Sequence, residues 1–185
     1  MILRKWQDEI VNRYTEICKS HRKFILKAPT GAGKTVLASE IIKKFYRNKK
    51  ILVLCHRLVL LEQLERELKV DHKVKKLGIS ENTKCFGNSD IILSTNLRSK
   101  YAVASLIPDA DLIIIDEAHR VSPIGSAYQR VLDIFDTNGK KSSHIMGLTA
   151  SPERRTGNQN DQLGLVFDAI IDCADVNTLI KENVL

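Results

Sequence analysis

The chain has 185 residues, and its 29 Lys and Arg against 22 Asp and Glu leave a formal net charge of +7. A length of this order fits one compact domain, and a composition of 43% hydrophobic and 28% charged residues excludes disorder along most of the chain. No stretch approaches the roughly 20 apolar residues of a membrane span, and the first residues lack the apolar core of a signal peptide. We therefore expect a soluble, intracellular, cytoplasmic protein.

The spacing of the cysteines and the distribution of charge further limit the kinds of site and partner that we expect. Cys18, Cys55, Cys85 and Cys173 are too far apart for a CxxC redox pair or a zinc-ligand spacing, so free thiols are expected. The charge is uneven: residues 1–90 carry 20 basic and 10 acidic residues, and residues 91–185 carry 9 and 12. A basic half favours a polyanionic partner, although scattered surface lysines more often form only a solvated face.

The first predicted element is a helix, because apolar residues recur at helical spacing behind the acidic residues Asp8 and Glu9; they are Ile10, Val11, Tyr14, Ile17 and Cys18. A short apolar strand follows at 24–26. It enters a glycine-containing segment at 28–35, and a second helix is indicated by Leu37, Ala38, Ile41, Ile42 and Phe45. The order is strand, glycine loop, helix.

A continuous apolar strand is predicted at 51–55, followed by a helix marked by Leu61, Leu64 and Leu68. Four further short strands are predicted, at 91–93, 112–115, 145–148 and 169–171. Strands that are apolar on both faces are typical of a mainly parallel sheet covered by helices, and right-handed crossovers then give an α/β three-layer sandwich. The polar segment 156–161 is predicted to be a mobile loop.

The segment from Ala28 to Thr35 fits the phosphate-loop pattern GxxxxGK[ST], except that alanine stands at the first glycine. Successive backbone N–H groups can pack against a phosphate chain only where the backbone turns tightly, which Gly31 and Gly33 allow. Lys34 is predicted to contact the β and γ phosphates, and the Thr35 hydroxyl to bind Mg²⁺. The alternative, an incidental glycine turn, is disfavoured because the segment lies between a strand and a helix. The expected nucleotide-binding residues of the loop are Thr30, Gly31, Ala32, Gly33, Lys34 and Thr35.

An acidic pair, Asp116 and Glu117, ends the strand predicted at 112–115. Carboxylates at the carboxyl end of a buried parallel strand lie in the crevice where α/β sheets bind ligands. We expect Asp116 to anchor Mg²⁺ and Glu117 to orient and deprotonate the water that attacks the γ-phosphorus. A surface cluster is the common alternative for such a pair, but the upstream phosphate loop disfavours it.

Three segments in this order, 28–35, 116–119 (Asp-Glu-Ala-His) and 147–152 (Gly-Leu-Thr-Ala-Ser-Pro), resemble motifs I, II and III of the superfamily 2 helicases. The chain is similar to the amino-terminal RecA-like, DEAH-box ATP-binding domain of that superfamily over residues 1–185, in the restriction and excision-repair branch. The resemblance implies ATP and Mg²⁺ as cofactors. In the opening segment it implies that Arg4 and Gln7 lie at the nucleotide and that the glutamine reads adenine.

The same resemblance implies further roles. The motif III strand is expected between the phosphate-loop strand and the acidic strand, with Thr149 and Ser151 coupling the ATP site to the nucleic-acid track. His119 is expected to join the catalytic set of Lys34, Asp116 and Glu117 and to couple the γ-phosphate site to motif III or to the partner lobe. Segment 53–63 resembles motif Ia, and segment 92–95 resembles motif Ib or Ic, so the expected nucleic-acid contacts are Arg57, Gln63, Ser94 and Thr95. Lys73, Lys75 and Lys76 are expected to form a solvated face.

DNA is favoured over RNA because motif III, Glu153-Arg154 and the later 164–168 resemble the duplex-DNA branch. The family places a second RecA-like lobe after motif III, and none is encoded here, so we expect a fragment of a longer chain. An arginine finger contributes about 10³ to 10⁵ in turnover, so the isolated fragment should be nearly inactive. The alternatives are an RNA helicase lobe, a small phosphate-loop phosphotransferase, or a nucleic-acid-binding module with a silent ATP site.

Overall fold

A computed structural model of the chain describes residues 3–55, 58–68, 72–77, 85–95, 105–121, 127–151, 163–164 and 166–181. Its centre is a seven-stranded sheet in the order β3-β4-β2-β5-β6-β1-β7, and every paired strand is parallel. The strands are β1 (Lys23–Lys27), β2 (Ile51–Cys55), β3 (Val74–Lys76), β4 (Ile91–Thr95), β5 (Leu112–Asp116), β6 (His144–Thr149) and β7 (Ala169–Asp172).

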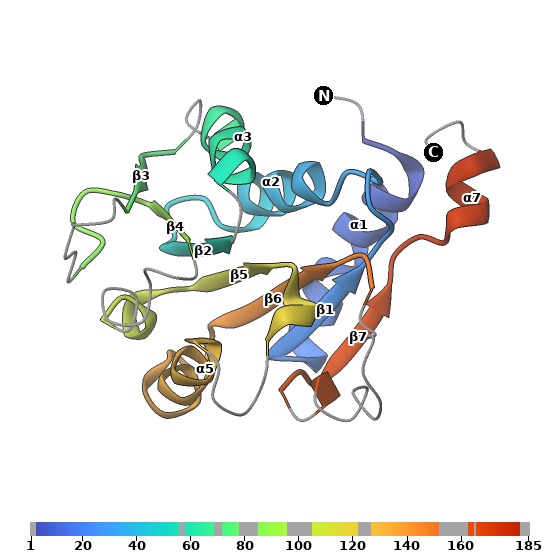
Figure 1. Cartoon of the computed structure of the whole chain (residues 1–185). Helices are drawn as coiled ribbons and strands as arrows, with labels where there is room; N and C mark the ends of the chain where they lie inside the picture. The colour runs from blue at the N-terminus through green and yellow to red at the C-terminus, as the bar shows by residue number, and fades with distance from the viewer. Residues whose placement is uncertain are drawn as a thin grey trace.

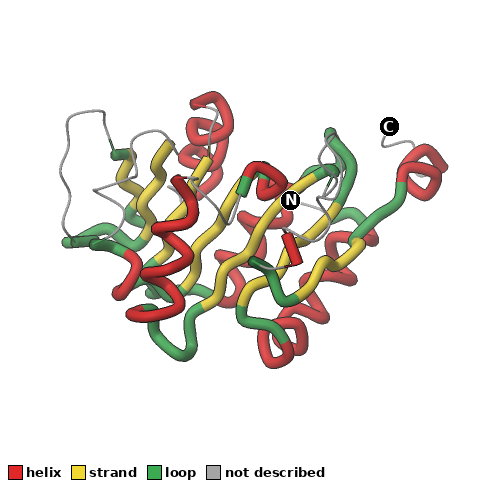
Figure 2. The backbone as a smooth tube through the Cα atoms, turned by 60° about the horizontal axis from the view of Figure 1, so that its bottom comes forward, coloured by secondary structure: helices red, strands yellow, loops and turns green. Residues whose placement is uncertain are grey.

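Helices cover both faces of the sheet, which gives three layers (Figures 1 and 2). Helices α1 (Lys5–Ser20), α2 (Lys34–Phe45), α3 (Leu58–Leu68) and α7 (Val176–Lys181) contribute to one apolar core. Helix α5 (Ala127–Asn138) and the short 3₁₀ turns η1 (Ile107–Asp109) and η2 (Ala118–Arg120) contribute to the core on the opposite face. No described helix has the length and apolar character needed to cross a membrane.

The predicted α/β three-layer class is confirmed, and so are all six predicted strands. The motif III strand β6 does lie between β1 and β5. Burial explains this success, because all five residues of β2 and the first four of β5 are buried. Strand β3 was not predicted, since it is a short edge strand that carries two lysines. The segment 156–161, predicted to be mobile, lies outside the described residues.

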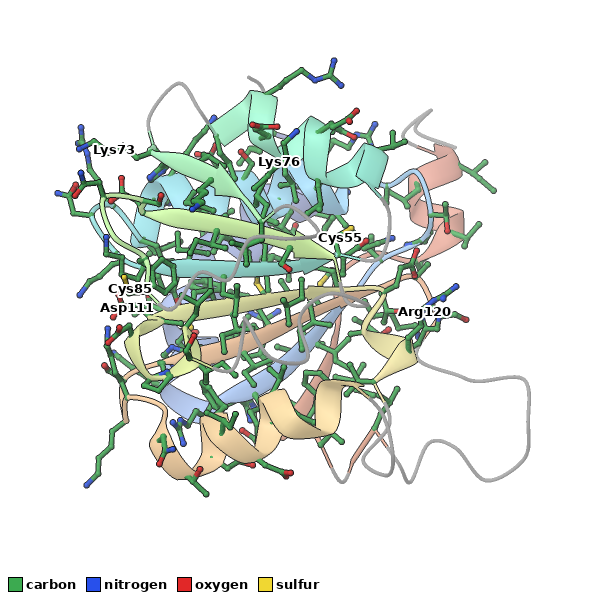
Figure 3. The ribbon with its side chains drawn as sticks, turned by 60° about the vertical axis from the view of Figure 1, so that its left-hand side comes forward. Cys55, Lys73, Lys76, Cys85, Asp111 and Arg120 are labelled. Carbon is green, nitrogen blue, oxygen red and sulfur yellow. The ribbon has the colours of Figure 1, made fainter. Side chains whose placement is uncertain are left out.

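Charged side chains fix the amino ends of the strands. The Asp111 carboxylate, at the start of β5, accepts hydrogen bonds from the Lys50 backbone N–H at 2.8 Å and from Lys140 Nζ at 3.1 Å. The Asp168 carboxylate accepts the backbone N–H groups of Arg22 and Lys23, at 2.9 and 2.8 Å, where β1 begins. Asp111 lies at the end of the sheet opposite to Cys55 (Figure 3). These contacts fix the start of the strands whose far ends form the candidate site.

Candidate active site

The phosphate loop joins β1 to α2 and needs its glycines. Gly31 and Gly33 have φ of 80° and 99°, in the left-handed region that side chains disfavour. A Cβ on Gly33 would also lie 2.7 Å from the Gln7 side-chain nitrogen. The loop is closed by the Ala32 N–H, which donates to the Pro29 carbonyl at 3.2 Å. The predicted conformational demand on both glycines is therefore present in the fold.

Lys34, at the first position of α2, folds back over the loop. Its ammonium donates to the Ala28 carbonyl at 2.8 Å and to the Pro29 carbonyl at 3.0 Å. Burial lowers the pKa of Lys34, and the nearby carboxylates of Glu117 and Asp116 act in the opposite direction. The lysine is thus partly desolvated and within electrostatic reach of both acids, although 81 residues or more separate them in sequence.

The topology explains how the acids approach the loop. Strand β6 pairs with both β1 and β5, in registers that align Lys27 with Thr149 and Asp116 with Leu148. The ends of β1 and β5 are therefore about 9 to 10 Å apart, two strand spacings. On the far side, Cys55 Sγ at the end of β2 donates to Asp116 Oδ2 at 3.3 Å. The carboxylate is held at the edge of the sheet, between β2 and the loop.

The donor chemistry at this edge fits magnesium. Thr35 and Asp116 offer a hydroxyl and a carboxylate, and Mg²⁺ in nucleotide sites is held by one or two such oxygens together with phosphate and water. Within the described part of the chain, no cluster of three His, Cys, Asp or Glu could hold a metal. Thr35 and Asp116 therefore fit an ion shared with a nucleotide.

Glu117 and His119 form a linked group with motif III. Glu117 has φ 52° and ψ 50°, a left-handed conformation that costs a residue with a side chain roughly 1 to 3 kcal/mol. His119 Nδ1 lies 3.2 Å from Glu117 Oε2 and 3.0 Å from Thr149 Oγ1. Thr149 Oγ1 also donates to the Ser151 carbonyl at 3.1 Å and accepts the Ser151 N–H at 3.2 Å. The structure thus brings together four predicted residues: Glu117, His119, Thr149 and Ser151.

The opening segment contacts the phosphate loop directly. Gln7 Nε2 donates to the Gly33 carbonyl at 2.9 Å, and Gln7 Oε1 accepts the Arg4 N–H at 2.9 Å. Arg4 Nη1 donates to the carbonyls of Gly31 and Ala32. Gln7 is only 2% exposed. Adenine reading by Gln7 stays a prediction. The support that Arg4 and Gln7 give to the loop was not predicted, because no local pattern signals a contact across 26 residues.

The predicted nucleic-acid contacts are placed less completely. Arg57 and the Glu153-Arg154 pair lie outside the described residues, as does the side chain of Thr95. Gln63 is half-buried on α3. Ser94 is 1% exposed, and its contact with nucleic acid stays a prediction. Among the lysines expected on a solvated face, Lys73 and Lys76 are exposed (Figure 3), and Lys76 pairs with Glu65.

Beside the phosphate loop, a pocket of about 660 Å³ opens between the loop and the junction of β7 with α7. Its walls include Thr30 and Ser151, which were predicted site residues, and the segment 172–176, which was not. Asp172 forms an ion pair with Lys27 at 2.8 Å. Burial raises the pKa of Cys173 to about 12, so its thiol stays neutral. This part of the pocket wall could have been predicted from the sequence, because 172–176 follows the last predicted strand at the same edge of the sheet.

Comparison with known proteins agrees with this geometry. The family model of the type III restriction enzyme res subunit matches residues 1–154. The chain belongs to this family. A relative of the res-family domain, putative helicase 22 of the Sulfolobus islandicus filamentous virus (isolate Iceland/Hveragerdi), is 32% identical over 156 residues, which cover 77% of this chain and 26% of the viral protein.

Solved structures resemble the res-family domain over most of its length. The Hef helicase domain of Pyrococcus furiosus matches with a TM-score of 0.72 and 25% identity, covering 91% of this chain and 38% of that one. A nuclease-deletion mutant of the type ISP restriction-modification enzyme LlaGI, solved with a DNA substrate mimic, matches with a TM-score of 0.71 and 19% identity, covering 100% of this chain and 21% of that one. The chain therefore has the fold of a RecA-like, ATP-binding helicase domain of superfamily 2, and it spans two fifths or less of these relatives.

Proposed function

We propose that this domain binds ATP with Mg²⁺ and hydrolyses it in response to duplex DNA, as one lobe of a helicase or translocase. One observation carries the proposal. The phosphate loop with Lys34 follows β1, Asp116 and Glu117 lie at the end of β5, and only β6 separates these two strands at the carboxyl edge of the sheet, where such folds bind ligands. Membership of a family that includes helicases supports the same conclusion.

Each residue of the site has a role that follows from its chemistry. The loop N–H groups and Lys34 bind the phosphates, and the Lys34 ammonium exchanges its bonds to the Ala28 and Pro29 carbonyls for bonds to phosphate oxygens. Thr35 and Asp116 would hold Mg²⁺, which when bound neutralises charge on the phosphates. Glu117 orients the attacking water and takes up its proton.

The contact between His119 and Thr149 supports a coupling role for motif III. Because Nδ1 of His119 lies beside both Glu117 Oε2 and Thr149 Oγ1, a shift of the 149–151 segment would move His119 and change the surroundings of the Glu117 carboxylate. We propose that nucleic acid bound near motif III acts on hydrolysis through this link. DNA is favoured over RNA because the fold matches a restriction enzyme solved with a DNA mimic. A second RecA-like lobe in the same longer protein would complete the site.

The decisive experiment compares two Glu→Gln variants of the intact protein. Glu117→Gln should lower DNA-stimulated ATP hydrolysis by about 10² to 10⁴-fold, the usual contribution of a general base, while fluorescent-nucleotide binding persists. Glu9→Gln, an exposed position on α1, is the matched control and should retain full turnover. Unimpaired hydrolysis by Glu117→Gln would refute the proposal. Stimulation by RNA in place of DNA would overturn only the choice of polymer.

A further inference from the structure

Gly147 lies in the middle of β6, aligned with Ile25 of β1 on one side and Ile115 of β5 on the other. Its φ is outside the left-handed region, so the backbone conformation of the strand does not require glycine. Space does. A Cβ at this position would lie 2.7 Å from the Cβ of Ala118, 3.0 Å from Ile25 Cγ1 and 3.3 Å from Phe167 Cε1. The shortest of these distances cannot be accommodated without a shift.

The neighbour that would have to move stands between two proposed functional residues. Ala118 is the first residue of η2, is fully buried, and is flanked in sequence by Glu117 and His119. Its methyl group rests against the bare backbone of β6. Gly147 and Thr149 are two residues apart on the strand, so they share a face, and His119 bonds Thr149 on that face. One surface of β6 therefore contacts η2 at two successive points.

We propose that Gly147 is a positioning residue for Glu117 and His119: the absence of its Cβ sets the height at which η2 rests on the sheet, and through that height the placement of these two residues. This inference rests on the role proposed for Glu117. Asp116 is less affected, because it belongs to the β5 ladder and is held by Cys55. The phosphate loop joins β1 to α2 and is not part of η2.

These differences separate positioning from simple core packing. If the only role of Gly147 is to avoid a steric clash in the core, Gly147→Ala lowers the free energy of unfolding and leaves turnover per folded molecule unchanged. If it sets the height of η2, the same change lowers kcat and spares nucleotide affinity. A displacement of about 1 Å in a catalytic group costs up to about 10²-fold in rate.

The test uses the intact protein with saturating duplex DNA. We expect Gly147→Ala to lower kcat by about tenfold or more, with the KM for ATP within about threefold of the parent. Adding Ala118→Gly, which removes the opposing methyl group, should recover at least about half of the lost activation free energy, since it relieves the shortest contact. Gly164→Ala is the matched control, because a Cβ there meets no atom of the described residues within 4 Å.

The outcomes are distinct. A kcat of Gly147→Ala near the parent value, or a loss that Ala118→Gly does not relieve, overturns the inference. If Gly147→Ala does not fold, the Gly147→Ala/Ala118→Gly variant carries the test, and it must show both a cooperative thermal transition and recovered turnover. Activity retained by Glu117→Gln would instead defeat the proposed function. If Glu117→Gln loses activity while Gly147→Ala keeps full activity, the positioning role is refuted and the proposed function is not.

Discussion

At the amino ends of the strands, charged side chains form hydrogen bonds with the backbone N–H groups that begin the strands. At the carboxyl ends, comparable charged groups have contacts that they can exchange for others. Asp111 and Asp168 accept backbone N–H groups that begin β2 and β1, and no rearrangement is needed there. Lys34, by contrast, donates to carbonyls of its own loop, and Glu117, whose own backbone is left-handed, lies beside His119. Stability and chemistry are thus assigned to opposite edges of one sheet.

Replacing one lysine at each edge should give the largest difference in ATP turnover between the two edges. Lys34→Ala should lower ATP turnover by about 10² to 10³-fold, because it removes an electrostatic contact to the phosphates. Lys140→Ala, at the amino edge, loses a partly exposed ion pair with Asp111 and should cost about 1 kcal/mol or less in the free energy of unfolding, with turnover unchanged. Hydrolysis assays and urea titrations measure the two. A loss of activity in Lys140→Ala would break the comparison.

Asp111→Ala should be the most destabilising of the amino-edge changes. It leaves the Lys50 N–H and the Lys140 ammonium without their shared carboxylate, at a cost of about 2 to 3 kcal/mol in the free energy of unfolding. Urea denaturation measures the loss. Turnover per folded molecule should stay at the parent value, and a fall in turnover that exceeds the loss of folded protein would contradict the assignment of this edge to stability.

Thr149→Val sharpens the comparison at the carboxyl edge. Valine keeps the buried shape and removes the hydroxyl that bonds His119 and Ser151, so DNA-stimulated turnover should fall by about tenfold, equivalent to one or two hydrogen bonds. The ratio of stimulated to basal hydrolysis is the measurement. Thr137→Val, an exposed threonine on α5 that bonds only within its helix, serves as the control. Equal stimulation in both variants would remove Thr149 from the coupling pathway.

The smallest expected effect is a change in the pH dependence of stability through His144, at the start of β6. Burial, assisted by the charge of Arg22, lowers its pKa below the ordinary value of 6.5, despite the hydrogen bond to the Cys18 carbonyl. Above pH 6.5 the imidazole is neutral in both the folded and the unfolded chain. As the pH falls below 6.5, the unfolded chain takes up the proton first, so the free energy of unfolding decreases.

His144→Gln should remove this part of the acid sensitivity. Urea titrations at about pH 7.5 and about pH 5.5 compare the variant with the parent. The difference in stability between the two proteins should shift in favour of the variant at the lower pH. A difference that is the same at both values would show that His144 does not titrate on unfolding in this range.

The sheet was predictable because burial on both faces leaves a simple trace in the sequence. The run at 51–55 is uninterrupted, and all of it is buried. Strand β3 carries no such trace, because an edge strand with Lys75 and Lys76 resembles a loop in composition. The position of β6 between β1 and β5 followed from the resemblance to helicases, since strand order cannot be worked out from periodicity.

In the candidate site, the residue types were predictable and the contacts between them were not. Lys34 was predicted from the phosphate-loop pattern, and Asp116 and Glu117 from their position at the end of an apolar strand. The left-handed backbone conformation of Glu117 could not be predicted, because such positions are usually recognised by a glycine in the sequence and this one holds a glutamate. The same holds for the bonds from Arg4 and Gln7 to the phosphate loop, which depend on how α1 packs against α2. Long-range packing, rather than local preference, decides these details.

The place of β1 between β6 and β7 has a consequence for how the protein is made. Both neighbours of this strand are encoded more than 100 residues after it, with Lys23 aligned to Ile145 and Phe24 to Ala169. At about 5 to 20 residues per second of translation, the strand that carries the phosphate loop emerges from the ribosome and waits roughly 6 to 25 s for its first sheet partner. During that interval its apolar side chains are available to chaperones, and the nucleotide site is among the last parts of the domain to form.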